Sequence, residues 1–470
     1  MTLALTGGTV VAALDPPRVV AADVLVEDGR IAAVGPSVTR PGVARRDCSG
    51  CLLVPGNVCA HTHLYSALSP GMPFDLEPPR TFLEILQRVW WRLDRALDEE
   101  AIRMSALVGG AAALLAGTTT LVDHHASPNA ADGSLDVLAD ALGGLGLRAV
   151  LCYETSDRDG PAVARAGIRE NVRFLARART GAYPLARAMV GAHASFTLSD
   201  ETLAACAEAA ATDGVGLHVH VAEDAVDERD CLGRHGRRVV ERLAAAGALT
   251  ERALLAHAVH VEAVEAALIR GAGATVAHNA RSNMHNAVGR PPLDLLGEAV
   301  ALGTDGIGAD MVEESRAAYL RRREEAVTVS PAWTLARLAE GARFAGRAFG
   351  EPALGRLEPG APADLAVLAY DPPTPLSAAS LGGHWVFGVA NGRVRDVLVA
   401  GEVVVGDGRL TRLEEAALAA EARAVAGRLW ARLERIAPHP FEPGSGPWRE
   451  PASAKGRPRR AAVGTRGGHG

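Results

Sequence analysis

The chain has almost no lysine. Its 470 residues include 49 Lys and Arg residues, and only Lys455 is a lysine. Because no lysine precedes position 455, the folded body can contain neither a catalytic or Schiff-base lysine nor a phosphate-loop lysine. A carbamylated lysine that bridges two metal ions is excluded as well. Any metal site must therefore use other ligands, which favours one metal ion over two.

The chain also has no excess of positive charge and few cysteines. The formal net charge of −6 provides no field that would recruit nucleic acid or an anionic membrane. Cys48 and Cys51 form a C-x-x-C pair, but no second pair completes a zinc site, so we interpret them as buried thiols. Six cysteines in a long chain fit a reducing cytoplasm, where we expect the protein.

Targeting and membrane segments are not expected. The first 16 residues lack the cationic start and long apolar run of a signal peptide. Residues 104–122 carry no charge and could pass a hydropathy filter for a membrane span. Their glycines, consecutive threonines and following Asp-His-His sequence favour a buried helix and then a buried strand.

The two ends of the chain resemble each other and differ from the middle. Strand and turn patterns occupy roughly the first 50 residues, with Asp28-Gly29 as a hairpin turn, and they return at 364–370 and 394–408. We therefore predict a composite β-sandwich domain from 1–54 and 355–410. It is followed by a helix within 411–437 and a Gly-, Pro- and Arg-rich tail over 438–470 that we expect to be disordered.

The middle of the chain, 55–354, alternates short apolar runs with alanine- and arginine-rich helical stretches. Near-continuous apolar strands separated by helices are typical of a parallel sheet covered on both faces. Asp98 is a predicted N-cap and Gly117 a predicted stop for one such helix. Eight strand–helix units predict a (β/α)8 TIM barrel in an α/β protein. The runs are 52–63, 119–125, 147–154, 189–196, 216–224, 253–260, 274–283 and 299–306.

Histidines gather at these runs, where the carboxyl ends of barrel strands would form an active site. His61 and His63 are two residues apart on a strand, so their side chains point to the same side. His220 ends the fifth run, and Asp305 ends the eighth. Three imidazoles and a carboxylate would then converge, leaving room for water, which predicts a metal site with these four ligands.

Further residues at the strand ends are candidates for catalysis and binding. Glu223 is a candidate proton carrier within reach of substrate, with a surface acid beside Asp224 as the less favoured alternative, and His257 would face the same water. His218 lies deeper on the same face as His220, and we interpret it as a hydrogen-bonded residue of the barrel interior. His193 and His125 are candidate substrate contacts. The pair at 90–91, Trp-Trp, either shapes a lid or packs into the interior.

These motifs resemble those of the amidohydrolase superfamily, in particular its metal-dependent deaminase and chlorohydrolase branch. The resemblance lies in PGNVCAHTH (55–63), HVHVAED (218–224), LLAHAVH (254–260), ALGTDGIGADM (301–311) and EPGAPADLAVL (358–368). WWRLDRALDEE (90–100), DHHASP (123–128) and HNARSNM (278–284) are similar to the SsnA-type aminohydrolases.

The resemblance implies one divalent metal ion, Zn²⁺ or Fe²⁺, held by His61, His63, His220 and Asp305. It assigns Glu223 as proton shuttle and His257 as the histidine that orients water. A water molecule activated by the metal, with its pKa lowered towards ~7, would attack an amino-bearing ring carbon. Asp305 would accept its proton, and Glu223 would protonate the ring nitrogen and the leaving amine.

The expected function is thus that of an aminohydrolase releasing ammonia from a cyclic amidine or heteroaromatic amine, such as a purine-like ring. The expected partners are this small molecule and water, with neither nucleic acid nor membrane, in a homodimer or higher homo-oligomer. The alternatives are dechlorination, alkylamine release or cyclic-amide hydrolysis on the same barrel. A further alternative is a non-catalytic metal-binding component of a purine-catabolic assembly.

Overall fold

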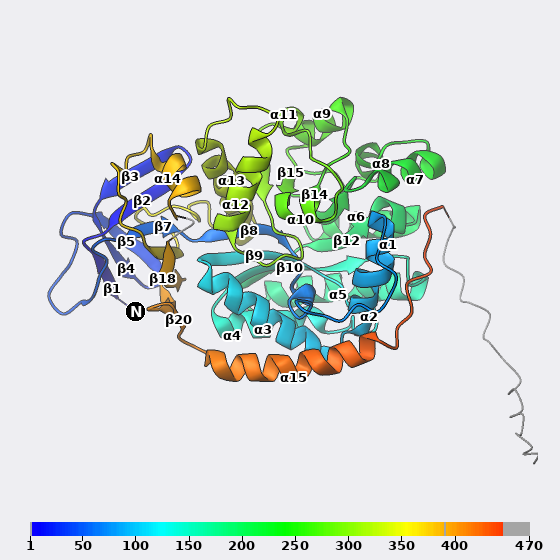
Figure 1. Cartoon of the computed structure of the whole chain (residues 1–470), viewed down its shortest axis with the longest axis horizontal. Coiled ribbons are helices and arrows are strands. Elements are labelled where there is room, and N and C mark those ends of the chain that lie inside the picture. Colours follow the sequence, from blue (N-terminus) through cyan, green and yellow to red (C-terminus); the bar gives the residue numbers. More distant parts are fainter. Residues whose placement is uncertain (1, 390–391, 445–470) are drawn as a thin grey trace, which may run out of the picture.

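A barrel of parallel strands forms the centre of the computed structural model, which describes residues 2–389 and 392–444 (Figure 1). Neighbouring strands follow chain order, and a parallel bridge between Thr62 and Asp305 closes the ring. The predicted (β/α)8 barrel is confirmed. Its strands are β8 (Asn57–Thr62), β9 (Thr118–His125), β10 (Arg148–Thr155), β12 (Val190–Ala194), β13 (Leu217–Val221), β14 (Leu254–His257), β15 (Thr275–His278) and β16 (Val300–Leu302), with β11 (Ala186–Ala188) paired to β10.

The first predicted strand, 52–63, is in fact two strands. β7 (Leu52–Pro55) belongs to a different sheet, and only β8 enters the barrel. The chain passes between them at Gly56, where an added Cβ would lie 2.2 Å from Thr119 Oγ1. Continuous apolar sequence hid this change of sheet, because both strands are buried on both faces.

Helices cover the outside of the barrel (Figure 1). The predicted N-cap is present, since Asp98 accepts a hydrogen bond from the Ala101 amide at 2.9 Å. Gly117 turns the chain with φ +79°, a conformation that suits glycine. The helices are α3 (Glu99–Leu115), α4 (Ser134–Leu145), α5 (Pro161–Arg179), α6 (Asp200–Thr212), α7 (Ala225–His235), α8 (Val239–Ala245), α9 (Ala263–Ala272), α10 (Ala280–His285), α11 (Leu293–Leu296), α12 (Met311–Arg323) and α13 (Ala332–Phe349), with a 3-10 turn, η3 (Ser195–Thr197).

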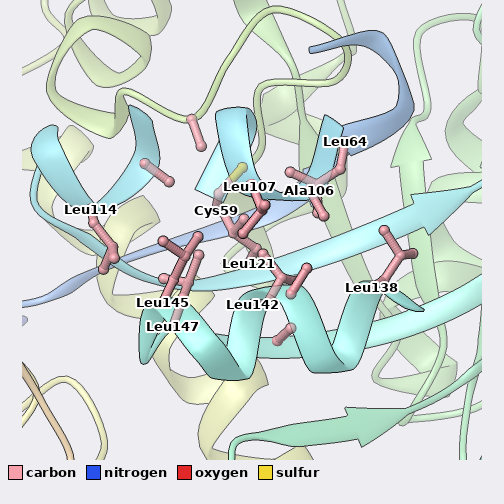
Figure 2. Close-up of a cluster of buried hydrophobic side chains, with 14 of the residues drawn as sticks. Cys59, Leu64, Ala106, Leu107, Leu114, Leu121, Leu138, Leu142, Leu145 and Leu147 are labelled. Carbon is pink, nitrogen blue, oxygen red and sulfur yellow. The ribbon is translucent and has the colours of Figure 1, made fainter. Parts of the chain in front are cut away.

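Leucine side chains fill the space between α3, α4 and the strands beneath them (Figure 2). Leu121 of β9 and Leu142 of α4 are almost completely buried. The two helices approach closely at Gly110, where an added Cβ would lie 2.7 Å from Leu145 Cδ1. Burial of one such leucine contributes roughly 1.5–3 kcal/mol, so this cluster fixes the helical layer onto the strands that carry the site.

Two small sheets built from both ends of the chain form the predicted β-sandwich. Their facing sides share one core, which includes Leu5 and Val24 of one sheet and Leu53 and Leu365 of the other. The four-stranded sheet contains β1 (Leu3–Thr6), β4 (Asp23–Glu27), β5 (Arg30–Gly35) and β6 (Ala44–Asp47). The seven-stranded sheet contains β7 with β2 (Thr9–Leu14), β3 (Pro17–Ala21), β17 (Leu365–Ala369), β18 (Arg393–Val399), β19 (Glu402–Gly406) and β20 (Arg409–Leu410).

The segment between β8 and α3 and the end of the chain lie against each other. Helix α15 (Glu415–Leu433) runs along α3 and α2, and residues 436–444 then continue past α2 (Figure 1). Residues 438–444 belong to the predicted tail, yet His439 and Phe441 are buried against Trp91; 445–470 lie outside the described residues. The elements of the first segment are η1 (Leu64–Ser66), α1 (Phe82–Ile85), η2 (Leu86–Trp90) and α2 (Trp91–Ala96), and α14 (Leu381–Phe387) follows β17.

Residues 104–122 form most of α3 and the start of β9, as predicted. Their lack of charge reflects burial inside the protein. Among the described residues, every helix is too short or too polar to cross a lipid bilayer.

Candidate active site

The structure brings the four predicted metal ligands together at the carboxyl ends of the strands. His63 Nε2 lies 3.1 Å from His220 Nε2 and 3.1 Å from Asp305 Oδ1, and His61 Nε2 lies 3.7 Å from the same oxygen. Donor atoms that share a metal ion at 2.0–2.2 Å are themselves roughly 3–3.6 Å apart. The spacing of these atoms therefore fits a single divalent ion.

The second nitrogen of each of the three imidazoles is already in use. His63 Nδ1 donates to the His124 carbonyl at 2.6 Å, and His220 Nδ1 donates to the His193 carbonyl at 2.8 Å. His61 Nδ1 lies 2.9 Å from Nε2 of His218. These contacts direct all three Nε2 lone pairs towards the same point, as outer partners of metal-binding histidines do.

Burial and charge also suit a cation here. His61 Nε2 is buried without a hydrogen-bond partner in the described part of the chain. Desolvation by burial lowers the pKa of His61 to about 3, which keeps its lone pair free. Burial opposes a charge on His63 too, but hydrogen bonding and charge from Asp305 outweigh it and raise the pKa of His63 to about 9. The site thus favours one positive charge beside Asp305, which a metal ion would supply.

A competing donor set, His63, His124, Glu154 and His220, lies beside the first. His124 Nδ1 is 3.1 Å from Glu154 Oε2, and His124 Nε2 is 3.1 Å from the carbonyl of His218. Both ring nitrogens of His124 therefore lie against hydrogen-bond acceptors rather than an open position. This favours the predicted four-ligand set.

Glu223 and His257 lie next to these ligands. His257 Nε2 is 3.5 Å from Glu223 Oε2 and 4.0 Å from Asp305 Oδ2. His257 Nδ1 donates to Asn283 Oδ1 at 2.8 Å, so its Nε2 lone pair faces the site. Burial, reinforced by the charge of Asp305, raises the pKa of Glu223 well above its usual range. Burial therefore favours the protonated form of Glu223, the form that can donate a proton.

Two residues of the site have an unusual backbone. His257 has φ +73° and Asp305 has φ +53°, both in the left-handed region that non-glycine residues seldom adopt. Each directly ends or follows a barrel strand, where the chain turns sharply to aim the side chain inward. Strained conformations of this kind concentrate at functional sites.

The sequence did not point to several supporting residues. Ser282 donates a short hydrogen bond to Asp305 Oδ2, and Asn286 Nδ2 lies 3.4 Å from Glu223 Oε1. Ser282 belongs to α10, which follows β15, and Asn286 is the C-cap of that helix. Ser282 lies in the stretch 278–284 noted for its resemblance. The signal that could have revealed them is a polar run directly after the seventh strand.

Glu154 of β10 is the other residue that sequence reasoning missed. Its carboxylate is buried and accepts from Arg158 Nη1 at 2.8 Å. Burial disfavours the charged form, but His193, His124 and Arg158 outweigh it and hold the pKa of Glu154 well below its usual range. Arg158 also pairs with Asp94 of α2 at 2.5 Å, which ties the segment after the first barrel strand, β8, to the loop after the third, β10.

The two predicted substrate contacts differ in their placement. His193 lines the cavity above the site, with Nδ1 2.7 Å from Thr197 Oγ1. His125 is not part of the cavity wall, and its Nε2 lies 2.9 Å from Ser127 Oγ. The expectation for His125 does not fit this placement, because adjacent residues of a strand face opposite sides and His124 takes the inward one. His218 lies in the barrel interior, bonded to His61.

Both aromatic and acidic residues line the cavity. Trp90 and Trp91 both line it, and Trp91 is only 1% exposed, so this pair forms the wall and also packs into the interior. The carboxyl groups and His220 come from the strand ends and from the loops that follow them. The full lining consists of His63, Tyr65, Ser66, Phe82, Leu86, Trp90, Trp91, Glu154, His193, Ala194, Phe196, His220, Glu223, Asp224, Asp227, Ser282, His285, Asn286, Asp305, Gly306 and Ile307.

A (β/α)8 barrel with converging histidines and a carboxylate at the carboxyl ends of its strands defines a metal-dependent hydrolase class. The chain belongs to the amidohydrolase family, whose model matches residues 52–404. The predicted membership in the amidohydrolase superfamily is confirmed.

Relatives of the chain include several deaminases. It is 33% identical over 419 residues to the 5-methylthioadenosine/S-adenosylhomocysteine deaminase of Nitratidesulfovibrio vulgaris, covering 86% of this chain and 92% of the relative. It is 32% identical over 440 residues to the 8-oxoguanine deaminase of Pseudomonas aeruginosa, covering 87% and 95%. A solved adenosine deaminase from Xanthomonas campestris with bound zinc is similar with a TM-score of 0.79 and 25% identity, covering 92% and 99%.

Proposed function

We propose that the protein is a metal-dependent aminohydrolase that converts a heteroaromatic ring amine to the corresponding oxo compound and ammonia. The observation that carries this proposal is the position of the buried Glu223 carboxyl group, 3.5 Å from His257 Nε2, in a cavity that His63, His220 and Asp305 also line. The deaminases among its relatives support the reaction class.

His61, His63, His220 and Asp305 would hold one divalent ion, with Zn²⁺ favoured over Fe²⁺ because a similar deaminase was solved with zinc. Such an ion lowers the pKa of a bound water molecule towards ~7 and so makes a nucleophile available at neutral pH. The absence of lysine before position 455 and the full use of both His124 ring nitrogens support one ion rather than two.

The protein's own residues divide the proton transfers. Asp305 points Oδ1 towards His61 and His63 and Oδ2 towards Ser282 and His257, so Oδ2 is placed to accept a proton from the attacking water. His257, held by Asn283, orients that water through Nε2. Glu223 protonates the ring nitrogen next to the reacting carbon.

The reaction balances without any further reactant. Water adds its oxygen to the ring carbon, the bond from that carbon to the exocyclic nitrogen breaks, and ammonia leaves. The proton taken up by Asp305 passes through Glu223 to the departing amine, and the proton left on the added oxygen restores Glu223 as the carbonyl forms. Aromatic residues of the lining hold the ring in place and exclude water.

The test combines metal analysis with an ammonia-release screen of purines, pyrimidines and triazines on zinc-loaded and chelator-treated protein. We expect about one metal ion per chain, metal-dependent ammonia release and, for Glu223→Gln, retained metal with turnover reduced by at least ~10²-fold. Full activity of the Glu223→Gln variant would overturn the role of Glu223. Stoichiometric metal with no turnover of any ring amine would favour a binding role.

We also propose a homodimer or larger homo-oligomer in the cytoplasm. The six free cysteines, all buried, support a reducing compartment. Light scattering of the purified protein measures the oligomeric state, and a monomer at micromolar concentration would contradict the proposed homo-oligomer.

A further inference from the structure

Among the described residues, those that line the cavity include neither arginine nor lysine, although arginine accounts for about one residue in ten of the chain. Five acidic residues do line it. From this imbalance we infer that the site accepts ring amines whose substituents are neutral or cationic and rejects those that carry a carboxylate or phosphate. The inference rests on the proposed function and narrows its substrate class.

Arginines that neighbour the lining residues turn away from the cavity. Arg281 precedes Ser282, but its guanidinium pairs with Glu313 and Glu314 on α12. Arg92 follows Trp91 and donates to the carbonyls of Leu433 and Ile436. Arg158 lies beneath the cavity, fully buried and paired with Glu154 and Asp94. None of these guanidinium groups is free to bind an anionic substrate.

One acid of the lining keeps an unpaired charge. Asp224 is partly exposed, makes no ion pair among the described residues, and accepts a hydrogen bond from the Val226 amide at 2.8 Å. Asp227 also lines the cavity and accepts from the amides of Phe196 and Ala222, but burial raises its pKa to about 7. An anionic substituent that approaches Asp224 therefore meets negative charge, which no arginine or lysine of the described lining offsets.

The aromatic residues of the lining select for a flat ring. Five of the 21 lining residues are aromatic, whereas aromatic residues make up 4% of the chain. They are Tyr65, Phe82, Trp90, Trp91 and Phe196. Such a wall stacks a planar heterocycle and provides no compensation for a desolvated anionic substituent. The predicted substrate is an uncharged or cationic derivative of a planar ring amine.

The experiment compares three charges on one ring. The adenine probes are 5′-deoxyadenosine (neutral), 5′-amino-5′-deoxyadenosine (cationic) and adenosine 5′-monophosphate (anionic). N9-ethyl-, aminoethyl- and carboxyethylguanine repeat the comparison on guanine. Binding is measured by calorimetry on the zinc-loaded Glu223→Gln variant, and turnover by ammonia release from the unaltered enzyme.

In each probe set that binds, we expect the affinity for the anionic member to be at least tenfold lower than that for the neutral member. The affinity for the cationic member should equal or exceed that for the neutral member. Equal affinity for the anionic member overturns the inference. A charge ranking in binding without ammonia release by the unaltered enzyme supports the inference and contradicts the proposed function. Failure of all six probes to bind overturns the inference for purine-type amines.

A matched pair of variants tests whether the lining sets this preference. His285 lines the cavity and is exposed, whereas its neighbour Met284 is 42% exposed and lies outside the lining. We expect His285→Arg to strengthen binding of the anionic probe at least fivefold, with the gain lost at high salt. Met284→Arg adds the same charge nearby and should leave the ranking unchanged. Equal effects of both variants would show that overall charge, rather than the lining, sets the preference.

Discussion

His218 Nε2 lies 2.9 Å from Nδ1 of His61, and the other ring nitrogen of His218 lies 3.5 Å from Cys152 Sγ. His218 thus accepts from His61 and donates towards the thiol, which leaves His61 Nε2 free for a metal ion. A residue that was expected only to fill the barrel interior fixes the tautomer of a ligand.

Replacement of His218 by Ala should weaken zinc binding about 10–100-fold, the usual cost of removing such an outer partner. Competition with a chelator of known affinity measures the effect. The control is His285→Ala, since His285 is exposed and lies outside the ligand cluster. Unchanged zinc affinity in His218→Ala would show that other contacts set the orientation of His61.

Replacement of Arg158 by Met should destabilise the fold by about 3–5 kcal/mol, because it leaves the carboxylates of Glu154 and Asp94 buried without their cation. Urea unfolding measures the change. The control is Arg103→Met, which removes an exposed pair with Glu421 and should cost at most about 1 kcal/mol. Similar values for the two variants would contradict the structural role of Arg158.

The alkaline limb of the pH–rate profile should depend on Asp224. Burial and the charges of Asp305 and Asp224 raise the pKa of Glu223, and activity requires the protonated form, so kcat falls as pH rises through that pKa. Asp224→Asn removes one negative charge, lowers the pKa of Glu223 and should move the limb to lower pH. Asp213→Asn, on the far side of α6, is the control. A limb that moves upward in Asp224→Asn would contradict this assignment.

Replacement of Leu142 by Ala should lower the free energy of unfolding by about 2–5 kcal/mol, because the shorter side chain leaves a cavity between α4, α3 and β9. Thermal and urea unfolding report the loss, and residual activity per folded molecule should be unchanged. Leu232→Ala, at a position that is 45% exposed, provides the comparison and should have little effect. A small loss of stability in Leu142→Ala would contradict this prediction and would mean that α3 and α4 move together to fill the cavity.

Patterns that depend on local geometry were predicted well. The spacing of His61 and His63 places both on one side of β8, because strand side chains alternate regardless of the rest of the fold. The eight apolar runs predicted the barrel, and Asp98 and Gly117 predicted the two ends of α3. The passage of the chain from one sheet to another at Gly56 was missed, since buried strands of both sheets have the same apolar composition.

Contacts between distant segments could not be predicted in this way. Glu154 reaches the site from β10, and Ser282 and Asn286 reach it from α10 and its C-cap. The relative placement of these two segments follows only from barrel closure. His125 was expected to contact substrate, but its neighbour His124 occupies the inward position. Residues 438–444 resemble a polar tail in composition, yet Phe441 and His439 find an aromatic surface in α2.

By itself, the sequence determined which chemistry is available to this protein. With a single lysine at position 455 and histidines at the ends of apolar runs, it limited the site to imidazole and carboxylate groups and favoured one metal ion. Only the tertiary structure decided how those groups are used. The orientation of the His61, His63 and His220 rings, the raised pKa of Glu223 and the absence of arginine from the described lining of the cavity all depend on burial and on partners that lie far apart along the chain.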